Sequence, residues 1–475
     1  MMKSILLPDK LHTIMFLFTK TNKMKKLMIA IALAFVSMAG MAQNFRANID
    51  ESVKPGDDFW HYAVGNWLKN NPLDKEHPKN GAFTDLDELN KKRINELIMK
   101  YANEKNLPQG SDGQKIGTLY RLYMDSVGRN KLGYEPIMPY LKQVRAIKTR
   151  EEALKVMTEL DVKGFDTAPY GISLGINTFN SSEYIVEVEH YGASLPQEYY
   201  GEPNEQQKLV VDVIKSLNKD FLKMVGNSEA DAERKMQAAW GIEHRIGVKQ
   251  LNQVEERDPQ KTTHIMPWEQ LLQDFKGIDW VAYRDAMGYP KDIDEVDVYQ
   301  LEPLHEVEKL LAEASVEELK AFMEIKVIRA YGAYLHDAFT DRMFEANKAI
   351  SGVQEQEPRW KRAVSVINNN LGENIGDNGG IQMAYRAFEN RMKQEPLNTI
   401  DGFTPAQRFY LAYARVWASN VTPEYTALLV NSDVHSPNNF RVNAALPMID
   451  SWYDAFNIQP TDKMFIPKEK RALVW

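Results

Sequence analysis

Two carboxylates in a glycine-rich stretch are the first residues of this chain that could carry out chemistry. Glu373 and Asp377 lie four apart in "NNNLGENIGDNGGIQMAYRAF" (368–388). Residues at i and i+4 share a helix face, so both carboxylates would point the same way, as in one half of a metal site. The four glycines of the stretch make a poor isolated helix but allow close backbone approach. The alternative is that two acids at a helix start complement its dipole.

A histidine and an arginine in a second polar stretch are the next candidates. His435 and Arg441 lie in "SDVHSPNNFRVNAALP" (432–447), which is rich in Asn, Ser and Pro. We interpret it as a loop. A loop histidine and arginine could bind a carbonyl oxygen or an oxyanion. They could equally be solvated residues without a chemical role.

The remaining histidines do not complete a zinc motif. No two of them lie four apart, and "HEVEK" (305–309) has a lysine where H-E-x-x-H needs its second histidine. We therefore expect His305 on a helix surface. Assembly of a site from distant histidines such as His244 and His336 stays open. The sequence also has no G-x-S-x-G, Walker or dinucleotide-binding motif and no cysteine, so any metal must be bound by histidine and carboxylate.

Composition places these residues in a protein with a substantial core. The chain has 475 residues, of which 44% are hydrophobic, and a formal net charge of −8 without long single-sign runs. Two or three domains are expected from this length. A basic surface for nucleic acid is not indicated. No segment of the mature chain is long and apolar enough for a transmembrane helix.

The N-terminal segment has the pattern of an export signal. Two lysines follow Met24, an apolar run extends from Leu27 to Val36, and small residues precede Gln43. This order predicts a secretory signal with cleavage after Ala42, and translation that starts at Met24. We therefore expect residues 1–42 to be an upstream extension plus signal peptide, and the mature protein to be periplasmic or secreted.

Most of the mature chain carries helix signals. Residues 55–72 have apolar residues at helical spacing behind two aspartates, and 209–222 have an apolar i, i+4 stripe that begins at Leu209. Capping boxes are predicted at Thr149, Ser315 and Thr404. Residues 171–196 differ, because two β-rich runs flank "NSS" and predict an antiparallel hairpin. The expected fold class is mainly α, a large helical lobe with a small β-hairpin insert.

Several separate sequence motifs, here called words, together resemble those of the neprilysin and endothelin-converting-enzyme family of zinc endopeptidases, in its bacterial oligopeptidase branch. They occur in family order along the whole mature chain: "PGDDFWHYAVGNWLKNNP", "SSEYIVEVEHYGASLPQEYY", "QEQEPRWKRAVSVINNNLGE", "LGENIGDNGGIQMAYRAF", "TPAQRFYLAYARVWA", "DVHSPNNFRVNAALPMIDSWYDAF" and the terminal "RALVW". The resemblance implies that Glu373 is a zinc ligand and that Asp377 orients a ligating histidine. It also implies that His435 and Arg441 steady the substrate and the tetrahedral intermediate.

The same resemblance shows what this sequence lacks. Family members carry H-E-x-x-H and an upstream N-A-[FY] word between "PRWKRAVSVINNNLGE" and "LGENIGDNGG", but here the two words are fused at the letters L-G-E. We infer the loss of a piece on the order of 200 residues. The N-terminal arginines that some members use for a substrate C-terminus align with Lys79 and Asp87, which puts that contact in doubt.

The expected organisation follows from this loss. Residues 43–370 should form the N-terminal helical lobe, and residues 371–475 a truncated remnant of a thermolysin-like catalytic domain. The remnant should leave the apolar side chains Trp417, Phe440, Trp452 and Phe456 partly exposed, because the helices that would normally pack against them are missing.

The expected function follows as well. The family uses zinc and acts on oligopeptides, but this chain should neither bind zinc nor hydrolyse peptides, because a catalytic zinc needs three protein ligands and an open position for water. The alternatives are a non-catalytic secreted module that binds peptides, and an active peptidase whose encoding DNA contains the missing segment.

Overall fold

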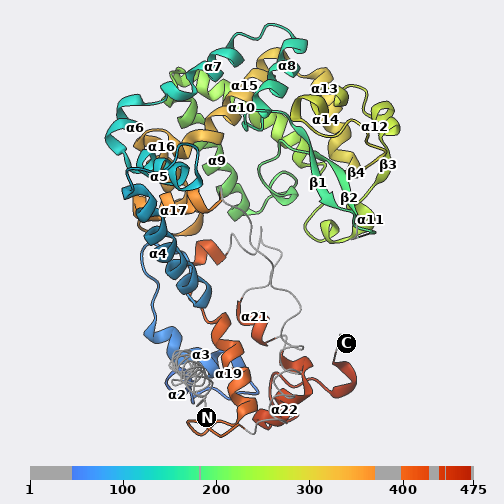
Figure 1. Cartoon of the computed structure of the whole chain (residues 1–475). Coiled ribbons are helices and arrows are strands. Elements are labelled where there is room, and N and C mark those ends of the chain that lie inside the picture. The colour runs from blue at the N-terminus through green and yellow to red at the C-terminus, as the bar shows by residue number, and fades with distance from the viewer. Residues whose placement is uncertain (1–44, 181–182, 370–396, 427–437, 444–445, 472–475) are drawn as a thin grey trace, which may run out of the picture.

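The computed structural model describes residues 45–180, 183–369, 397–426, 438–443 and 446–471. An upper lobe of helices arches over a smaller lower region in which the first and last described helices meet (Figure 1). The upper lobe and its connection to the lower region contain α4 (Ala82–Asn103), α5 (Asp112–Met124), α6 (Ser126–Leu132), α7 (Met138–Arg145), α8 (Arg150–Asp161), α9 (Glu205–Met224), α10 (Glu229–Gly247), α11 (Pro259–Thr262), α12 (Trp268–Asp274), α13 (Trp280–Met287), α14 (Leu301–Glu313), α15 (Val316–Tyr331), α16 (Asp337–Ser351) and α17 (Arg359–Asn369). The lower region contains α2 (Phe45–Asn48), α3 (Phe59–Asn70), α19 (Pro405–Trp417), α21 (Asn438–Asn443) and α22 (Asp450–Phe456). The predicted mainly helical fold is confirmed.

Helix starts follow the local sequence closely. The capping boxes predicted at Thr149, Ser315 and Thr404 are all formed, each with the N-cap oxygen and the N3 side chain bonded to the other residue's backbone N–H. Asp58 caps α3 by accepting from the His61 N–H. The stripe predicted on α9 is only partly right, because Leu209 is 43% exposed. Residues at i+4 drift around a helix by about 40° per step, so the stripe turns from solvent at Leu209 into the core at Phe221.

The predicted hairpin is confirmed, but it belongs to a larger sheet. Strands β1 (Tyr170–Ile176) and β2 (Tyr184–His190) pair antiparallel, with Tyr170 opposite His190. Strand β4 (Glu295–Tyr299) pairs parallel to β2, and β3 (Ile265–Pro267) pairs antiparallel to β4, giving the order β1-β2-β4-β3. The hairpin insert is therefore half of a four-stranded mixed sheet. The other half escaped prediction because its strands have only three and five residues.

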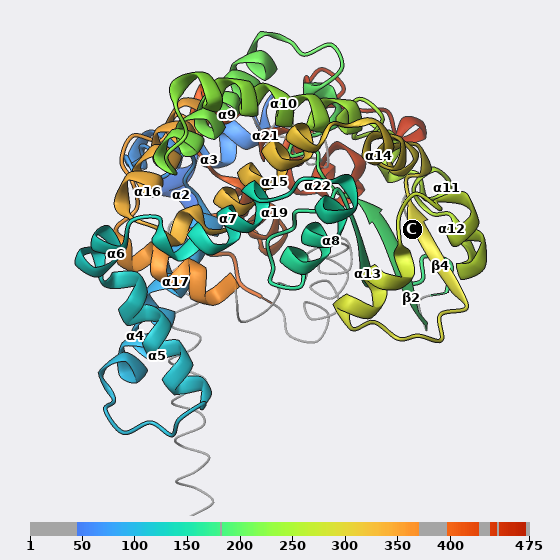
Figure 2. The same ribbon diagram turned by 90° about the horizontal axis from the view of Figure 1, so that it is seen from above.

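The upper lobe has its own hydrophobic core around α15. This helix packs against α7, α8, α9 and α10, and Figure 2 shows it near the centre of the lobe. Its side chains Phe322, Met323 and Val327 are almost fully buried among the 45 residues of this core. Such a core, built within residues 137–346, is consistent with a lobe whose stability is largely internal.

The C-terminal elements pack against α3. The expectation of partial exposure is wrong for Trp452 but holds for Trp417 and Phe456. Trp452 is fully buried, and Trp417 and Phe456 are partly buried in the same core. Phe59 of α3 supplies the cover, with its ring centroid 5.6 Å from that of Trp452 and 4.7 Å from that of Phe456. The side chain of Phe440 lies outside the described part of the chain. Helix α3 thus supplies part of the cover that these C-terminal side chains were expected to lack.

Candidate functional site

The structure describes only part of the predicted site. Glu373, Asp377 and His435 lie outside the described residues, as does the segment 1–42 with its predicted signal. Arg441 lies on α21, where the backbone alone is described. The roles assigned to these four residues therefore stay predictions.

The helix that carries Arg441 is anchored firmly by its neighbours. Asn443 at the end of α21 donates from Nδ2 to Asp58 Oδ1 at 2.8 Å and accepts the Trp60 N–H at 2.8 Å. Asn438 at the other end donates to Ser419 Oγ at 2.7 Å, and Val442 is fully buried. Residues 438–443 are therefore held between α3 and α19, which fixes where the end of the H-S-P-x-x-F-R word lies.

The charge of Asp58 is maintained at this junction. Burial raises the pKa of its carboxyl, but hydrogen bonds from the His61 backbone and side chain and from Asn443 outweigh burial and keep the pKa below its ordinary value. An ionised carboxylate at the start of α3 also complements the helix dipole. The same residue thus caps α3 and binds α21.

A second junction lies at the start of α17, the helix that leads toward Glu373. Lys361 donates from Nζ to Glu76 Oε2 at 2.7 Å and pairs with Glu88 Oε2 at 2.8 Å. Lys91 of α4 donates to Glu357 Oε1 at 2.7 Å. These ion pairs join residues more than 260 positions apart, so no local pattern could have predicted them.

The same junction contains the one group of three potential metal ligands in the described residues. Single ligand atoms of His77, Glu88 and Glu357 lie within 4.8 Å of one another. Lys361 and Lys91 already bind the two carboxylates, and burial, which raises the pKa of Glu88, is outweighed by Lys361, His77 and Lys91, so that its net pKa is lowered. The group therefore fits an ion-pair network better than a metal centre.

The other histidines, and the two positions that align with substrate-binding arginines of the family, form no further group of potential metal ligands among the described residues. Neither His244 nor His336 belongs to a group of three potential ligands within the described ranges. His305 is exposed on α14, as predicted, with its ring stacked on Phe275. Lys79 lies over the Tyr425 ring and Asp87 pairs with Lys91, so these two positions take part in structural contacts.

Comparisons with known proteins agree on one family. Two family models, both described as peptidase family M13, match residues 55–394 and 335–472. Endothelin-converting enzyme 1 of Rattus norvegicus is 26% identical over 345 residues, which is 69% of this chain and 44% of that protein. Neprilysin of Mus musculus is 39% identical over 110 residues, which is 22% of this chain and 14% of that protein. This chain belongs to peptidase family M13.

Solved structures share the fold. The zinc metalloprotease Zmp1 of Mycobacterium tuberculosis, in complex with an inhibitor, aligns with a TM-score of 0.81 at 16% identity, over 91% of this chain and 99% of that chain. PepO from Lactobacillus rhamnosis aligns with a TM-score of 0.72 at 14% identity, over 89% of this chain and 100% of that chain. By sequence, this chain spans less than half the length of the endothelin-converting enzymes that it matches. No helix among the described residues is long and apolar enough to cross a membrane.

Proposed function

We propose that this chain is a folded, exported member of peptidase family M13 that does not hydrolyse peptides, because an internal deletion has removed most of its zinc site. The observation that carries the proposal is the donor set of the sequence. Glu373 is present, but the chain has no H-E-x-x-H and no cysteine. A catalytic zinc takes three protein ligands and a water, so one carboxylate is insufficient. The glutamate of H-E-x-x-H, which would accept the proton of that water, is missing as well.

The comparisons support a loss inside the chain. The match to endothelin-converting enzyme 1 covers 69% of this chain but only 44% of that protein. The structural alignment with Zmp1 nevertheless extends over 99% of that chain. The ranges matched by the two family models overlap between residues 335 and 394, which includes the fused words at 371–373.

The decisive experiment measures zinc and hydrolysis on the purified mature chain and on the Glu373→Gln variant. We expect no stoichiometric zinc by mass spectrometry and no cleavage of a quenched fluorogenic oligopeptide, with and without chelator. Glu373→Gln should change neither result, since a lone carboxylate has no metal to lose. One tightly bound zinc that Glu373→Gln releases, together with chelator-sensitive cleavage, would refute the proposal. Long reads across the codons for residues 365–380 test the alternative that the DNA contains the missing segment.

A second candidate function is peptide binding without catalysis. The packing of the lower region favours it, because Trp452 is fully buried and α21 is anchored at both ends. A folded lower region holds the backbone of Arg441 in place on α21 even without a metal. Calorimetry with a mixed oligopeptide tests this candidate. Binding that Arg441→Met weakens at least tenfold would support it, and heat signals equal to those of a buffer blank would exclude it.

A further inference from the structure

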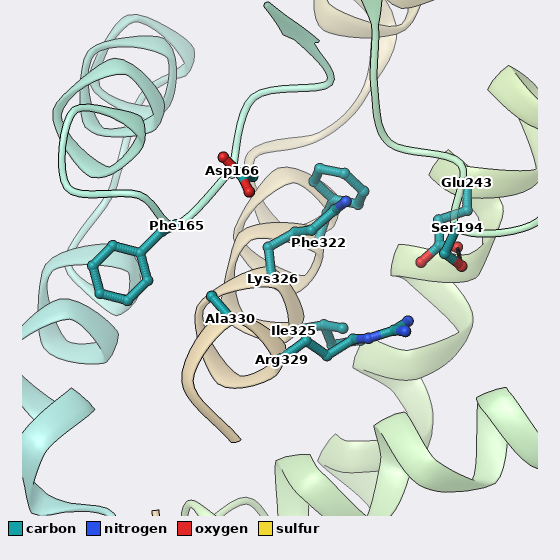
Figure 3. Close-up of a pocket in the computed structure, with 9 residues that line it drawn as sticks. All are labelled: Phe165, Asp166, Ser194, Glu243, Phe322, Ile325, Lys326, Arg329 and Ala330. Carbon is teal, nitrogen blue, oxygen red and sulfur yellow. Dashed lines mark hydrogen bonds between the residues drawn. The ribbon is translucent and has the colours of Figure 1, made fainter. Parts of the chain in front are cut away.

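A cavity of about 270 Å³ lies beside α15 in the upper lobe, well separated in sequence from the predicted zinc ligand. Figure 3 shows the residues of α15, α10 and two loops that line it, with the Phe165 ring turned away from the other labelled side chains. Phe165, Phe322 and Ile325 give it apolar walls. Asp166, Glu243, Lys326 and Arg329 add two negative and two positive charges to the same cavity. A mostly apolar pocket with a few converging charged groups is the usual form of a small-molecule site.

The two cations lie one turn apart on α15 and have no anionic partner. Neither Lys326 nor Arg329 makes an ion pair within 4.0 Å or a hydrogen bond with any described residue. Lys326 Nζ lies 5.3 Å from the centroid of the Phe322 ring, which is a weak substitute for a carboxylate. Burial lowers the pKa of Lys326 despite the attraction of Glu243, so the ammonium is poorly compensated as it stands. An anionic group in the cavity would supply the missing partner for both cations.

The two acids of the cavity, Asp166 and Glu243, have carboxylate oxygens that accept no hydrogen bond from the described residues. Ser194 Oγ and Tyr200 OH both donate to Glu243 Oε2, at 2.5 Å and 3.4 Å, while Oε1 has no hydrogen-bond partner among the described residues. Glu243 is 3% exposed. Asp166 is exposed and makes neither an ion pair nor a hydrogen bond with the described residues. A cationic group near these carboxylates would therefore be stabilised.

The loop that carries Asp166 is held in place by a buried carboxylate. Asp161 accepts from the backbone N–H and hydroxyl of Thr167 and from Tyr283 OH, the last at 3.1 Å. Asp166 itself has a φ of 49°, in the left-handed region that a non-glycine residue rarely adopts. Such a conformation persists only where the surroundings fix it, and it is enriched at ligand sites. The loop is thus pre-organised around the cavity.

We propose that this cavity binds a small zwitterion, a free α-amino acid with an apolar side chain, whose carboxylate contacts Lys326 and Arg329 and whose ammonium contacts Asp166 at the mouth. The ligand's carboxylate matches the two unpaired cations and its ammonium matches the acids, and Phe322 and Ile325 receive its apolar side chain. The volume is slightly below that of pockets for drug-sized ligands, which favours a molecule of this size. The site is independent of zinc and of the proposed peptide binding.

Calorimetry with L-leucine on the full mature chain tests the proposal. We expect saturable binding of L-leucine, none of N-acetyl-L-leucine, which lacks the ammonium, and none of L-leucinamide, which lacks the carboxylate. Arg329→Met and Asp166→Asn should each weaken binding at least tenfold, since each removes a charge-assisted hydrogen bond. Lys320→Met on the same helix, whose side chain pairs with Glu317 instead, is the matched control and should leave binding unchanged.

The outcomes separate a ligand site from a hydrated cavity. Thermal unfolding of each variant without ligand verifies that it is folded before its binding is compared. No heat from L-leucine or L-phenylalanine at about 10 mM, a concentration about tenfold above the 1 mM dissociation constant of a weak site, would leave only water in the cavity and overturn the proposal. Equal binding of inorganic phosphate would overturn it as well, because it would define an anion site without a role for Asp166.

Discussion

Truncation of Trp452 tests whether α3, from the N-terminal part of the chain, completes the hydrophobic core of the C-terminal region. The indole is fully buried, and Phe59 of α3 meets it edge to face at 5.6 Å. Replacing a fully buried tryptophan with alanine costs about 3–5 kcal/mol, through lost contacts and the cavity left behind. We expect Trp452→Ala to destabilise the lower region by that amount. Because Trp452 Nε1 has no hydrogen-bond partner among the described residues, Trp452→Phe should cost much less.

Hydrogen exchange followed by mass spectrometry locates the effect. The chain has separate cores, so a single unfolding midpoint would not show which region has changed. A loss of 3–5 kcal/mol raises exchange through opening by about 150- to 5,000-fold, unless a smaller local opening already dominates. We expect this acceleration in α3 (Phe59–Asn70) and α22, with α15 unchanged.

Trp280 provides the matched control, since it is equally buried but belongs to the core of the upper lobe. Trp280→Ala should accelerate exchange in the upper lobe and leave α3 unchanged. The reasoning is refuted if Trp452→Ala leaves exchange in α3 at the level of the unmodified chain. It is refuted equally if both variants affect α3 and α15 alike, because the two cores would then not be separate.

Three further predictions concern buried charges and a helix cap. Glu324, 1% exposed, binds Arg145 and Lys235; Glu324→Gln should cost about 3–5 kcal/mol in urea unfolding, because two cations lose their charged partner. Burial raises the pKa of Glu324, but these hydrogen bonds outweigh burial and lower the pKa below 4.5. The stabilisation by this carboxylate is therefore complete above pH 4.5 and is lost as the pH falls through the lower folded-state pKa. An acid titration of stability should show this loss in the unmodified chain and not in Glu324→Gln. Lys361→Met should lower the melting temperature, because the ion pair with Glu88 is lost. Zinc should then restore the melting temperature by binding to His77, Glu88 and Glu357, whereas the melting temperature of the unmodified chain should not respond to zinc in a thermal scan. Thr404→Ala should cost about 1 kcal/mol of unfolding free energy in a urea titration, since the capping box of α19 is lost, and an unchanged midpoint would contradict the cap.

Local sequence determined much of the secondary structure of this protein. The capping boxes at Thr149, Ser315 and Thr404 were predicted correctly because their partners lie three residues apart. The hairpin was predicted for the same reason, since its two strands are neighbours in the chain. The family words along the chain also indicated peptidase family M13, which the comparisons confirm. The argument that this chain lacks a complete set of zinc ligands rests on residue types alone, so it was made from the sequence without the structure.

Only the tertiary structure decided which distant residues meet. The contact of Phe59 with Trp452, the ion pairs of Lys361, and the pairing of β4 beside β2 all join segments far apart in the chain. The unpaired charges of Lys326 and Arg329 became visible for the same reason, because a helical spacing shows that two cations share a face but not which groups lie opposite. Packing partners depend on the path of the whole chain, whereas caps and turns depend on a few adjacent residues.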